Sequence, residues 1–392
     1  MSRGKVAALL ALLVAAAVLA GVRQGRQEVG AAGLEAVEVP AEMGIATSVK
    51  VRVYRGGQLV AEQEKVGDRL LYNFWALVLN AFLGRYYSTP LTIYRADGST
   101  FSQPEWELII SSTTSNPLLA IGFGSSEASV SFYDYEVPGL LGRVDVSSTA
   151  YSLFVNDTHI IVTANASWTA SSAVTVASVG LYWKGYSYGS TSAFYVLIAR
   201  DVLPSPISLQ ANDIVAATYT ITIAFNKPPF LKNLAALIAN YILGAKYYGK
   251  AVSYTTWGNT VVSAMDIGMD YYTSTTYDSV KEYLYVGITS DSVAYSPALY
   301  SVGILAESSS PVTVSWGYNS THVWFSVPPV SFLLQNGGTV RGVFARIKNV
   351  DVDGSTSYNA QQVMVLFFPL DTPVTVSAGS GIKLNFTVYF RW

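Results

Sequence analysis

The sequence of 392 residues contains a duplication, and this feature limits its fold more than any other. The stretch "LYNFWALVLNAFLGRYY", which begins at Leu71, is similar to "LKNLAALIANYILGAKYY", which begins at Leu231. Four further pairs of similar stretches follow in the same order, separated by 163 to 167 residues. Self-similarity at a nearly fixed spacing indicates repeated structural units. We therefore expect two homologous domains, repeat 1 (residues 47–226) and repeat 2 (residues 227–392).

The first pair of stretches predicts a helix at the start of each repeat. Apolar residues recur at helical spacing, and a glycine at the end favours the left-handed conformation that closes many helices. Short segments rich in β-branched and aromatic residues follow, separated by Gly, Ser, Asn and Pro. The expected fold is mainly β, with two tandem homologous antiparallel β-sandwich domains of jelly-roll type, each opened by one α-helix. The two helical stretches share these aligned positions: Asn73 with Asn233, Ala76 with Ala236, Leu77 with Leu237, Asn80 with Asn240 and Gly84 with Gly244.

The region before the first helix contains three further predicted elements. The start is basic and is followed by an uninterrupted apolar run from Val6 to Val22, which predicts a signal peptide over residues 1–20, or a membrane anchor if it is not cleaved. Residues 21–46 form an expected extended arm. A β-hairpin is predicted from Ser48 to Val66, with its turn at "RGGQ", and repeat 2 has no counterpart of it.

Composition narrows the classes of partner and compartment. Only 13% of the residues are charged and the net charge is −2, so no basic stripe is available to neutralise phosphates, and nucleic acid is not expected as a partner. The chain has no cysteine, which excludes disulfides, thiolate metal sites and a cysteine nucleophile. With the predicted signal, this low-charge chain rich in Ser, Thr and Tyr is expected outside the cell or on its surface, in contact with a membrane only through an uncleaved N-terminal segment.

The two histidines, His159 and His322, occur in the similar stretches "NDTHIIV" and "NSTHVWF". Because Asn, Asp and Ser bond their own backbone in tight turns, we interpret each stretch as the same hairpin turn and not as part of a shared metal site. Four Asn-x-Ser/Thr sequences are glycosylation candidates in a secreted chain. The turn positions are favoured over those in predicted strands; the four residues are Asn156, Asn165, Asn319 and Asn385.

Other polar clusters give weaker signals. "DVDGSTS" places Asp351 and Asp353 close together, as calcium loops do, but it lacks the later acidic ligand, so a solvated hairpin loop is the favoured interpretation. We expect no cofactor unless this loop binds calcium. Glycosidases use pairs of carboxylates, and two pairs occur in this chain. Acidic residues in strands also produce such pairs, and the common motifs of nucleophilic, nucleotide-dependent and zinc-dependent enzymes are absent, so we expect no enzyme. The pairs are Asp134 with Glu136 and Asp266 with Asp270.

Strings such as "FYDYE" and "GLYWKGYSYG" place many aromatic rings in loops and on strand faces. Aromatic rings are favoured in interfaces, but they also form cross-strand pairs within a sheet, and both interpretations stay open. Together with "IGFGSSEAS" and "VGLYWKG", the segment "ARDVLPSPISLQANDIVAATYTITI" resembles patterns in virion and tail structural proteins of tailed phages and archaeal viruses. The sequence is also similar to subunits of archaeal extracellular filaments. Neither resemblance implies catalytic residues.

These observations favour a secreted structural protein that assembles with itself into an extracellular filament or surface layer. The expected mechanism is strand addition, in which the arm and the face of Val49, Val51 and Val53 complete a sheet of the next subunit. An adhesin or glycan-binding module is the alternative hypothesis. A secreted glycan-active enzyme is the third.

Overall fold

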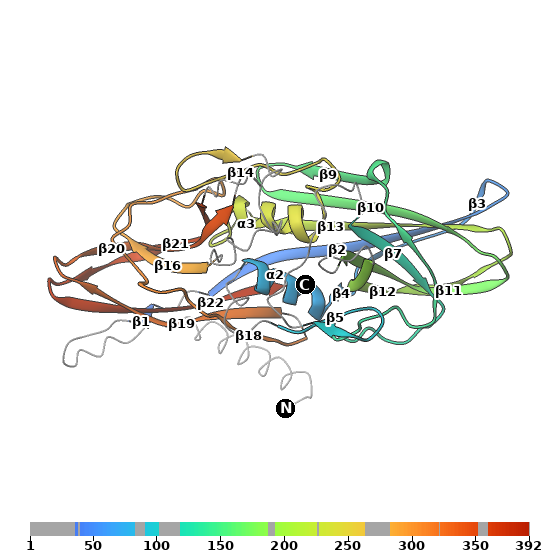
Figure 1. Ribbon diagram of the computed structural model, residues 1–392, viewed down its shortest axis with the longest axis horizontal. Coiled ribbons are helices and arrows are strands. Elements are labelled where there is room, and N and C mark those ends of the chain that lie inside the picture. Colours follow the sequence, from blue (N-terminus) through green and yellow to red (C-terminus); the bar gives the residue numbers. More distant parts are fainter. Residues whose placement is uncertain are drawn as a thin grey trace, which may run out of the picture.

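The computed structural model describes residues 36–37, 40–82, 91–101, 118–186, 193–225, 227–262, 283–320, 322–351 and 360–391. The protein is mainly β, as expected, with several antiparallel sheets and two short helical segments. It is elongated, and most of its long strands run along the longest axis (Figure 1). The predicted N-terminal signal lies outside the described residues. Within them, neither helical segment is long and apolar enough to cross a membrane.

Most elements in the first half of the chain are strands, and the longest of them, β12, has 17 residues. Their bounds are β1 Ala36–Val37, β2 Pro40–Arg55, β3 Gln58–Val66, β4 Arg69–Leu70, α2 Tyr72–Phe82, β5 Ile93–Tyr94, β6 Thr100–Phe101, β7 Leu119–Gly124, β8 Leu140–Asp145, the 3-10 turn η1 Ser148–Ala150, β9 Tyr151–Val155, β10 His159–Thr169, β11 Val174–Tyr186, β12 Ala193–Leu209 and β13 Ile214–Ala224.

The second half repeats the order of elements that starts at α2. Its helix continues into a short π-helical turn. The bounds are α3 Lys232–Leu237, η2 Ile238–Ile242, β14 Tyr254–Thr255, β15 Val261–Val262, β16 Tyr283–Thr289, β17 Ala306–Glu307, β18 Ser315–Tyr318, β19 His322–Leu334, β20 Gly338–Asp351, β21 Ala360–Val376 and β22 Ser380–Arg391.

Each repeat contributes a sheet with the same strand order. Repeat 1 forms the order β12-β11-β7-β8, with β4 added beside β12, and repeat 2 forms β21-β20-β16-β17. A third, nine-stranded sheet is built from both repeats. Its order is β18-β19-β22-β2-β13-β10-β9, with β1 beside β22 and β3 beside β2. The long strand β2 therefore lies between the last strand of repeat 2 and the last strand of repeat 1 (Figure 1).

The predicted hairpin is confirmed. β2 and β3 pair antiparallel around the turn Gly56–Gly57, where both glycines have positive φ. Strand β2 begins at Pro40, eight residues before the predicted start, so it crosses the boundary between the expected arm and repeat 1. Residues 40–46 of the arm are thus part of a regular strand.

The two helices are buried along most of their lengths, because apolar residues occupy nearly all of their surface. Two buried asparagines at equivalent positions, Asn80 in α2 and Asn240 in η2, each bond both backbone groups of one residue beyond the helix: the N–H and C=O of Leu91 and of Val252. The second helix ends as predicted, with Gly244 at φ +78°. The predicted end of the first, Gly84, lies outside the described residues.

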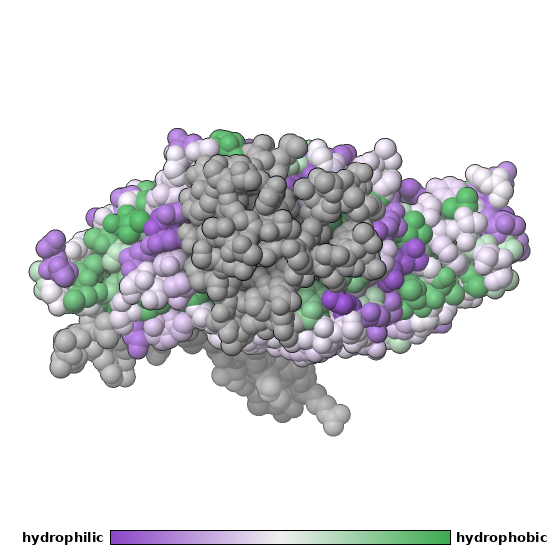
Figure 2. All heavy atoms as spheres, viewed as in Figure 1, coloured by the Kyte–Doolittle hydropathy of each residue, from purple (hydrophilic) through white to green (hydrophobic). Residues whose placement is uncertain are grey.

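The largest hydrophobic core is continuous between the repeats. At the junction, the rings of Trp75 and Phe390 lie 4.9 Å apart, and the rings of Tyr151 and Tyr248 stack at 4.1 Å. The Leu119 N–H donates to the Tyr248 hydroxyl at 3.0 Å. On the face that Figure 2 shows, strongly hydrophilic residues are scattered and do not gather in one patch. Because the core is continuous and these ring and hydrogen-bond contacts cross the junction, the two repeats pack as one body.

Candidate assembly site

Strand β2 changes its pairing partner along its length. Residues 45–54 pair antiparallel with residues 214–223 of β13. Residues 40–44 pair in parallel with residues 387–391 of β22. The change occurs between Gly44, which lies opposite Arg391, and the next residue, which lies opposite Ile223. One stretch of chain thus pairs with the last strand of each repeat.

Strand β1 extends the parallel pairing. Ala36 lies opposite Lys383 and Val37 opposite Leu384, in the same register that residues 40–44 keep with β22. We call residues 36–37 and 40–44 the N-terminal strand segment. It pairs with the last strand of the chain although nearly the whole sequence separates the two. Parallel pairing of this kind requires a long connection, and here both repeats supply it.

The expected assembly residues lie inside the protein. The side chains of Val49, Val51 and Val53 are at most 1% exposed and pack in the core that β13 also lines. The alternate residues point outward, where Lys50 contacts Glu62 at 2.9 Å and Arg52 contacts the same carboxylate at 2.7 Å. Hydrogen bonds from Arg52 and then Lys50 lower the pKa of Glu62. The valines therefore contribute to assembly only if the whole strand moves to another subunit.

The side chains around β3 cover an exposed edge of repeat 1. The Gln63 amide donates to the Ser205 C=O at 2.9 Å and accepts from the Ser205 N–H at 3.3 Å. The Lys65 ammonium donates to the Val202 C=O at 3.0 Å, and the Asp68 carboxylate accepts from the Val202 N–H at 3.1 Å. These contacts satisfy backbone groups that would otherwise offer an open edge to another chain.

The two histidines lie in equivalent hairpin turns, one in each repeat, as the sequence predicts. Asn156 N–H donates to the His159 C=O at 3.0 Å, and Asn319 N–H donates to the His322 C=O at 2.8 Å. In both turns the asparagine side-chain oxygen accepts from the histidine N–H, at 2.7 and 2.8 Å. Strands β13, β2 and β22 separate the two histidine strands in the nine-stranded sheet. The histidines therefore do not meet.

The four glycosylation candidates differ in their surroundings. Asn156 and Asn319 are exposed in their turns. The Asn165 amide is engaged at both ends, because its nitrogen donates to the Ala150 C=O at 2.9 Å and its oxygen accepts from Thr218 at 2.5 Å. Asn385 is half-buried within β22. The turn asparagines are thus the more accessible pair.

The two carboxylates of the first candidate pair, Asp134 and Glu136, bind different partners. Asp134 accepts from the fully buried Arg200 at 2.7 Å, and Glu136 accepts from the Tyr182 hydroxyl and from the Val137 N–H at 2.8 Å. Asp266, Asp270 and Asp353 lie outside the described residues, as does the side chain of Asp351, which ends β20. Among the described residues, no group of three or more His, Asp or Glu is placed to hold a metal ion.

Aromatic side chains make contacts between the two repeats. Phe132 of repeat 1 stacks on Tyr318 of repeat 2 at 4.2 Å, and Tyr133 meets the same ring edge-on at 5.7 Å. The pKa of Tyr133 is raised to about 12, mainly by burial and to a smaller extent by the hydrogen bond between Tyr133 and Tyr318. Tyr133 and Tyr318 nevertheless stay 43% and 39% exposed, so this cluster combines an internal contact with a surface.

Sequence reasoning found the hairpin, but it missed the parallel pairing between the N-terminal strand segment and β22. No local pattern signals such pairing. Comparisons of the chain with protein-family models, curated proteins and solved structures give no match.

Proposed function

We propose that the chain is a secreted structural protein, built from two tandem homologous β-sandwich domains, that assembles into an extracellular filament or surface layer. Copies would be joined by exchange of the N-terminal strand segment. The pairing of this segment with β22, in a register kept through β1 and β2, carries the proposal. Backbone hydrogen bonds provide the affinity in such strand addition.

The mechanism is an exchange of identical contacts between copies. The pairing partner of β2 changes after Gly44, so a change of backbone direction at this glycine releases the segment and leaves residues 45–54 on β13. The exposed edge of β22 then accepts the segment of a neighbouring copy, which makes the same contacts. Domain swapping creates no new interface chemistry, and a head-to-tail exchange that does not close produces a fibre.

A variant that lacks residues 1–44 tests the proposal. We expect the wild-type protein to form polymers in negative-stain microscopy and the variant to remain folded and monomeric. A synthetic peptide of residues 34–46 should bind the variant with one-to-one stoichiometry, whereas a scrambled peptide of the same composition should not. Normal filaments of the truncated variant would refute strand exchange.

A single substitution provides a milder test. Ala41→Pro removes one backbone N–H from the N-terminal strand segment and changes no residue of the strands that pair on either side. Polymer yield should fall while the far-UV circular dichroism spectrum stays that of the wild type. Unchanged polymer yield would indicate that the segment stays within its own chain.

The exposed Tyr133, Tyr135 and Tyr318 favour a second candidate function, adhesion to another surface through aromatic contacts. Tyrosine is enriched at protein interfaces because it buries a large area at a low entropic cost. This function predicts saturable binding by a monomeric protein without self-assembly.

A further inference from the structure

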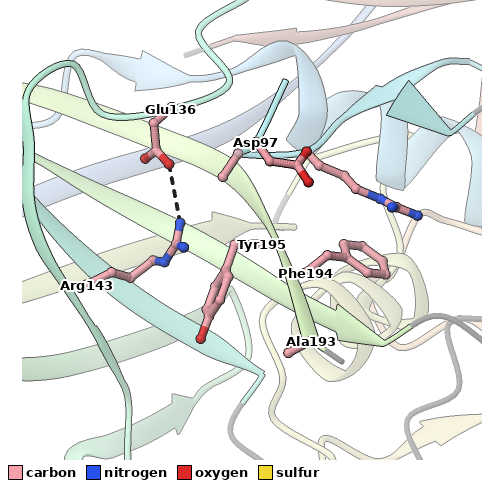
Figure 3. Close-up of a pocket in the computed structure, with 8 residues that line it drawn as sticks. Asp97, Glu136, Arg143, Ala193, Phe194 and Tyr195 are labelled. Carbon is pink, nitrogen blue, oxygen red and sulfur yellow. Dashed lines mark hydrogen bonds and ion pairs between the residues drawn. The ribbon is translucent and has the colours of Figure 1, made fainter. Parts of the chain in front are cut away.

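Repeat 1 contains a pocket of about 300 Å³ at one end of its own sheet. Its walls come from the turn after β5, the loop before β8, strand β8 itself and the beginning of β12. Four charged side chains line it together with two aromatic rings (Figure 3). The lining residues are Arg95, Ala96, Asp97, Glu136, Arg143, Ala193, Phe194 and Tyr195.

The duplication shows why this pocket is open. The Ala96 N–H donates to the Tyr195 C=O at 2.8 Å, and in repeat 2 the Trp257 N–H donates to the Gln362 C=O at 2.7 Å. Ala96 and Trp257 therefore occupy equivalent positions. The Trp257 ring covers the guanidinium of Arg346 at 4.4 Å. Repeat 1 has only a methyl group where repeat 2 has an indole.

The arginine–carboxylate pairs near these two positions also differ, and their arginines come from different strand positions. In repeat 2, Arg346 binds both oxygens of Glu307, at 2.5 and 2.8 Å, and is almost fully buried. In repeat 1, Arg143 reaches Glu136 with a single nitrogen at 3.4 Å and lies over the Tyr195 ring at 3.7 Å. Because a bidentate pair is the stronger arrangement, the guanidinium of repeat 1 is the less satisfied of the two.

Arg95, the second cation of the pocket, can also bind a ligand. Arg95 lies over the Phe194 ring at 4.5 Å, and its buried Nε has no hydrogen-bond partner among the described residues. Asp97 uses one oxygen, Oδ1, to hold the turn through the Ser99 N–H at 2.9 Å and the Ser99 hydroxyl at 2.6 Å. Figure 3 shows Arg143 and Tyr195 on one side of the pocket and Phe194 on the other.

We propose that this pocket binds a neutral saccharide unit. Two arginines and two carboxylates give the pocket no net charge, so it does not select an ionic ligand. It offers donors and acceptors side by side, which suits vicinal hydroxyl groups because each hydroxyl both donates and accepts. The aromatic rings provide apolar surface for the C–H face of a sugar, and the volume is at the lower end of the range for small-ligand pockets.

Protein produced without glycosylation should be titrated with a panel of neutral mono- and oligosaccharides, observed by saturation-transfer NMR. Ala96→Trp copies the side chain of repeat 2 and fills the pocket, so we expect it to weaken binding at least tenfold. Trp257→Ala makes the reverse change in repeat 2 and should alter affinity less than twofold. Glycans released from the native protein form a second arm, which distinguishes a ligand carried by another copy from an external one.

Arg143→Gln is a second test variant that does not depend on the folding of Ala96→Trp, because it removes the guanidinium without adding volume. It should also weaken binding while the thermal unfolding curve stays cooperative. Binding that survives both Ala96→Trp and Arg143→Gln would overturn the proposal, as would the absence of saccharide binding by the wild-type protein at millimolar concentration. The pocket involves no residue of β1, β2 or β22, so loss of polymer formation and loss of saccharide binding are separate outcomes.

Discussion

Asn73 and Asn233 make the same three hydrogen bonds in the two repeats. The Asn73 amide nitrogen donates to the C=O groups of Tyr94 and Leu197, and its oxygen accepts from the Tyr94 N–H. The Asn233 amide does the same with Met364 and with the N–H and C=O of Thr255. Each asparagine thus joins its helix to a short hairpin and to a long strand. The repeated sequence position corresponds to a repeated structural role.

Replacement of either asparagine by alanine should destabilise the protein strongly. Each change leaves buried backbone groups without partners, and each unsatisfied group costs about 1–3 kcal/mol, so we expect a loss of about 3 kcal/mol for Asn73→Ala and a similar loss for Asn233→Ala. Equilibrium denaturation in urea measures it. Ser152→Ala, on an exposed position of β9, is the control and should change stability by less than about 0.5 kcal/mol. A loss below about 1 kcal/mol in either asparagine variant would contradict this role.

Much of the local structure could be predicted from the sequence. The alternating valines of β2 predict a strand, the pair Gly56–Gly57 predicts its turn, and Gly244 predicts the end of a helix, because each depends on neighbouring residues alone. The joining of the repeats could not be predicted in this way. The pairing of residues 40–44 with β22 depends on the tertiary position of a strand more than 300 residues away, and no local pattern records that position.

The two repeats should unfold together. The Tyr248 hydroxyl of repeat 2 accepts the buried Leu119 N–H of repeat 1, so Tyr248→Phe retains the ring stack on Tyr151 and leaves that N–H without its partner. We expect a loss of about 1–2 kcal/mol, within the usual cost of an unsatisfied buried group. Tryptophan fluorescence and far-UV circular dichroism should follow one coincident transition in both proteins. Two separate transitions in the wild-type protein would show that the junction does not couple the repeats.

Asp201 should make stability depend on pH. Burial raises its pKa to about 6, an effect that the hydrogen bond from the Asp68 N–H only partly offsets. Because the folded state binds this proton more tightly than the unfolded state, its contribution is fully present below about pH 4 and is lost as the pH rises through about 6. Asp201→Asn removes the titration. At pH 7 we expect this variant to be more stable than the wild type by about 2–3 kcal/mol, as the size of the pKa shift implies.

Urea denaturation at pH 4, 5, 6 and 7 checks the effect of Asp201. The difference in unfolding free energy between the variant and the wild type should grow with pH and level off above pH 7. Asp97→Asn is a suitable control, because hydrogen bonds from Ser99 lower the pKa of Asp97 and its titration has the opposite sign. A difference that does not change between pH 4 and pH 7 would mean that Asp201 carries no excess proton in the folded state.

The candidate sites show the same limit of sequence reasoning as the fold. The Asn-x-Thr-His turns were recognisable because their chemistry lies within four residues. The pocket of repeat 1 was not, since Ala96 and Trp257 share no side-chain character and their equivalence appears only through matching backbone bonds. The carboxylates Asp134 and Glu136 are close in sequence, yet Asp134 binds Arg200 and Glu136 binds the Tyr182 hydroxyl, and the sequence gives no sign of either long-range partner.

Glycosylation should distinguish Asn156 from Asn165. In Asn156 the side-chain oxygen accepts the Thr158 N–H at 2.8 Å, the Thr158 hydroxyl at 3.0 Å and the His159 N–H at 2.7 Å, while its Nδ2, the atom that receives a glycan, makes no hydrogen bond among the described residues. In Asn165 the Nδ2 is bonded to the Ala150 C=O at 2.9 Å. We therefore expect a glycan on Asn156 when the protein passes through a glycosylating secretory pathway, and none on Asn165.

Intact-mass measurement before and after enzymatic deglycosylation tests this expectation, and peptide mapping assigns each occupied site. Asn156→Gln should remove one glycan mass, and Asn165→Gln should leave the mass pattern unchanged. The equivalent exposed turn at Asn319 should behave as Asn156 does, because the two turns share their backbone bonds. A glycan on Asn165, or unmodified turns in a protein that carries sugar elsewhere, would show that accessibility in the folded protein does not determine which sequons are used.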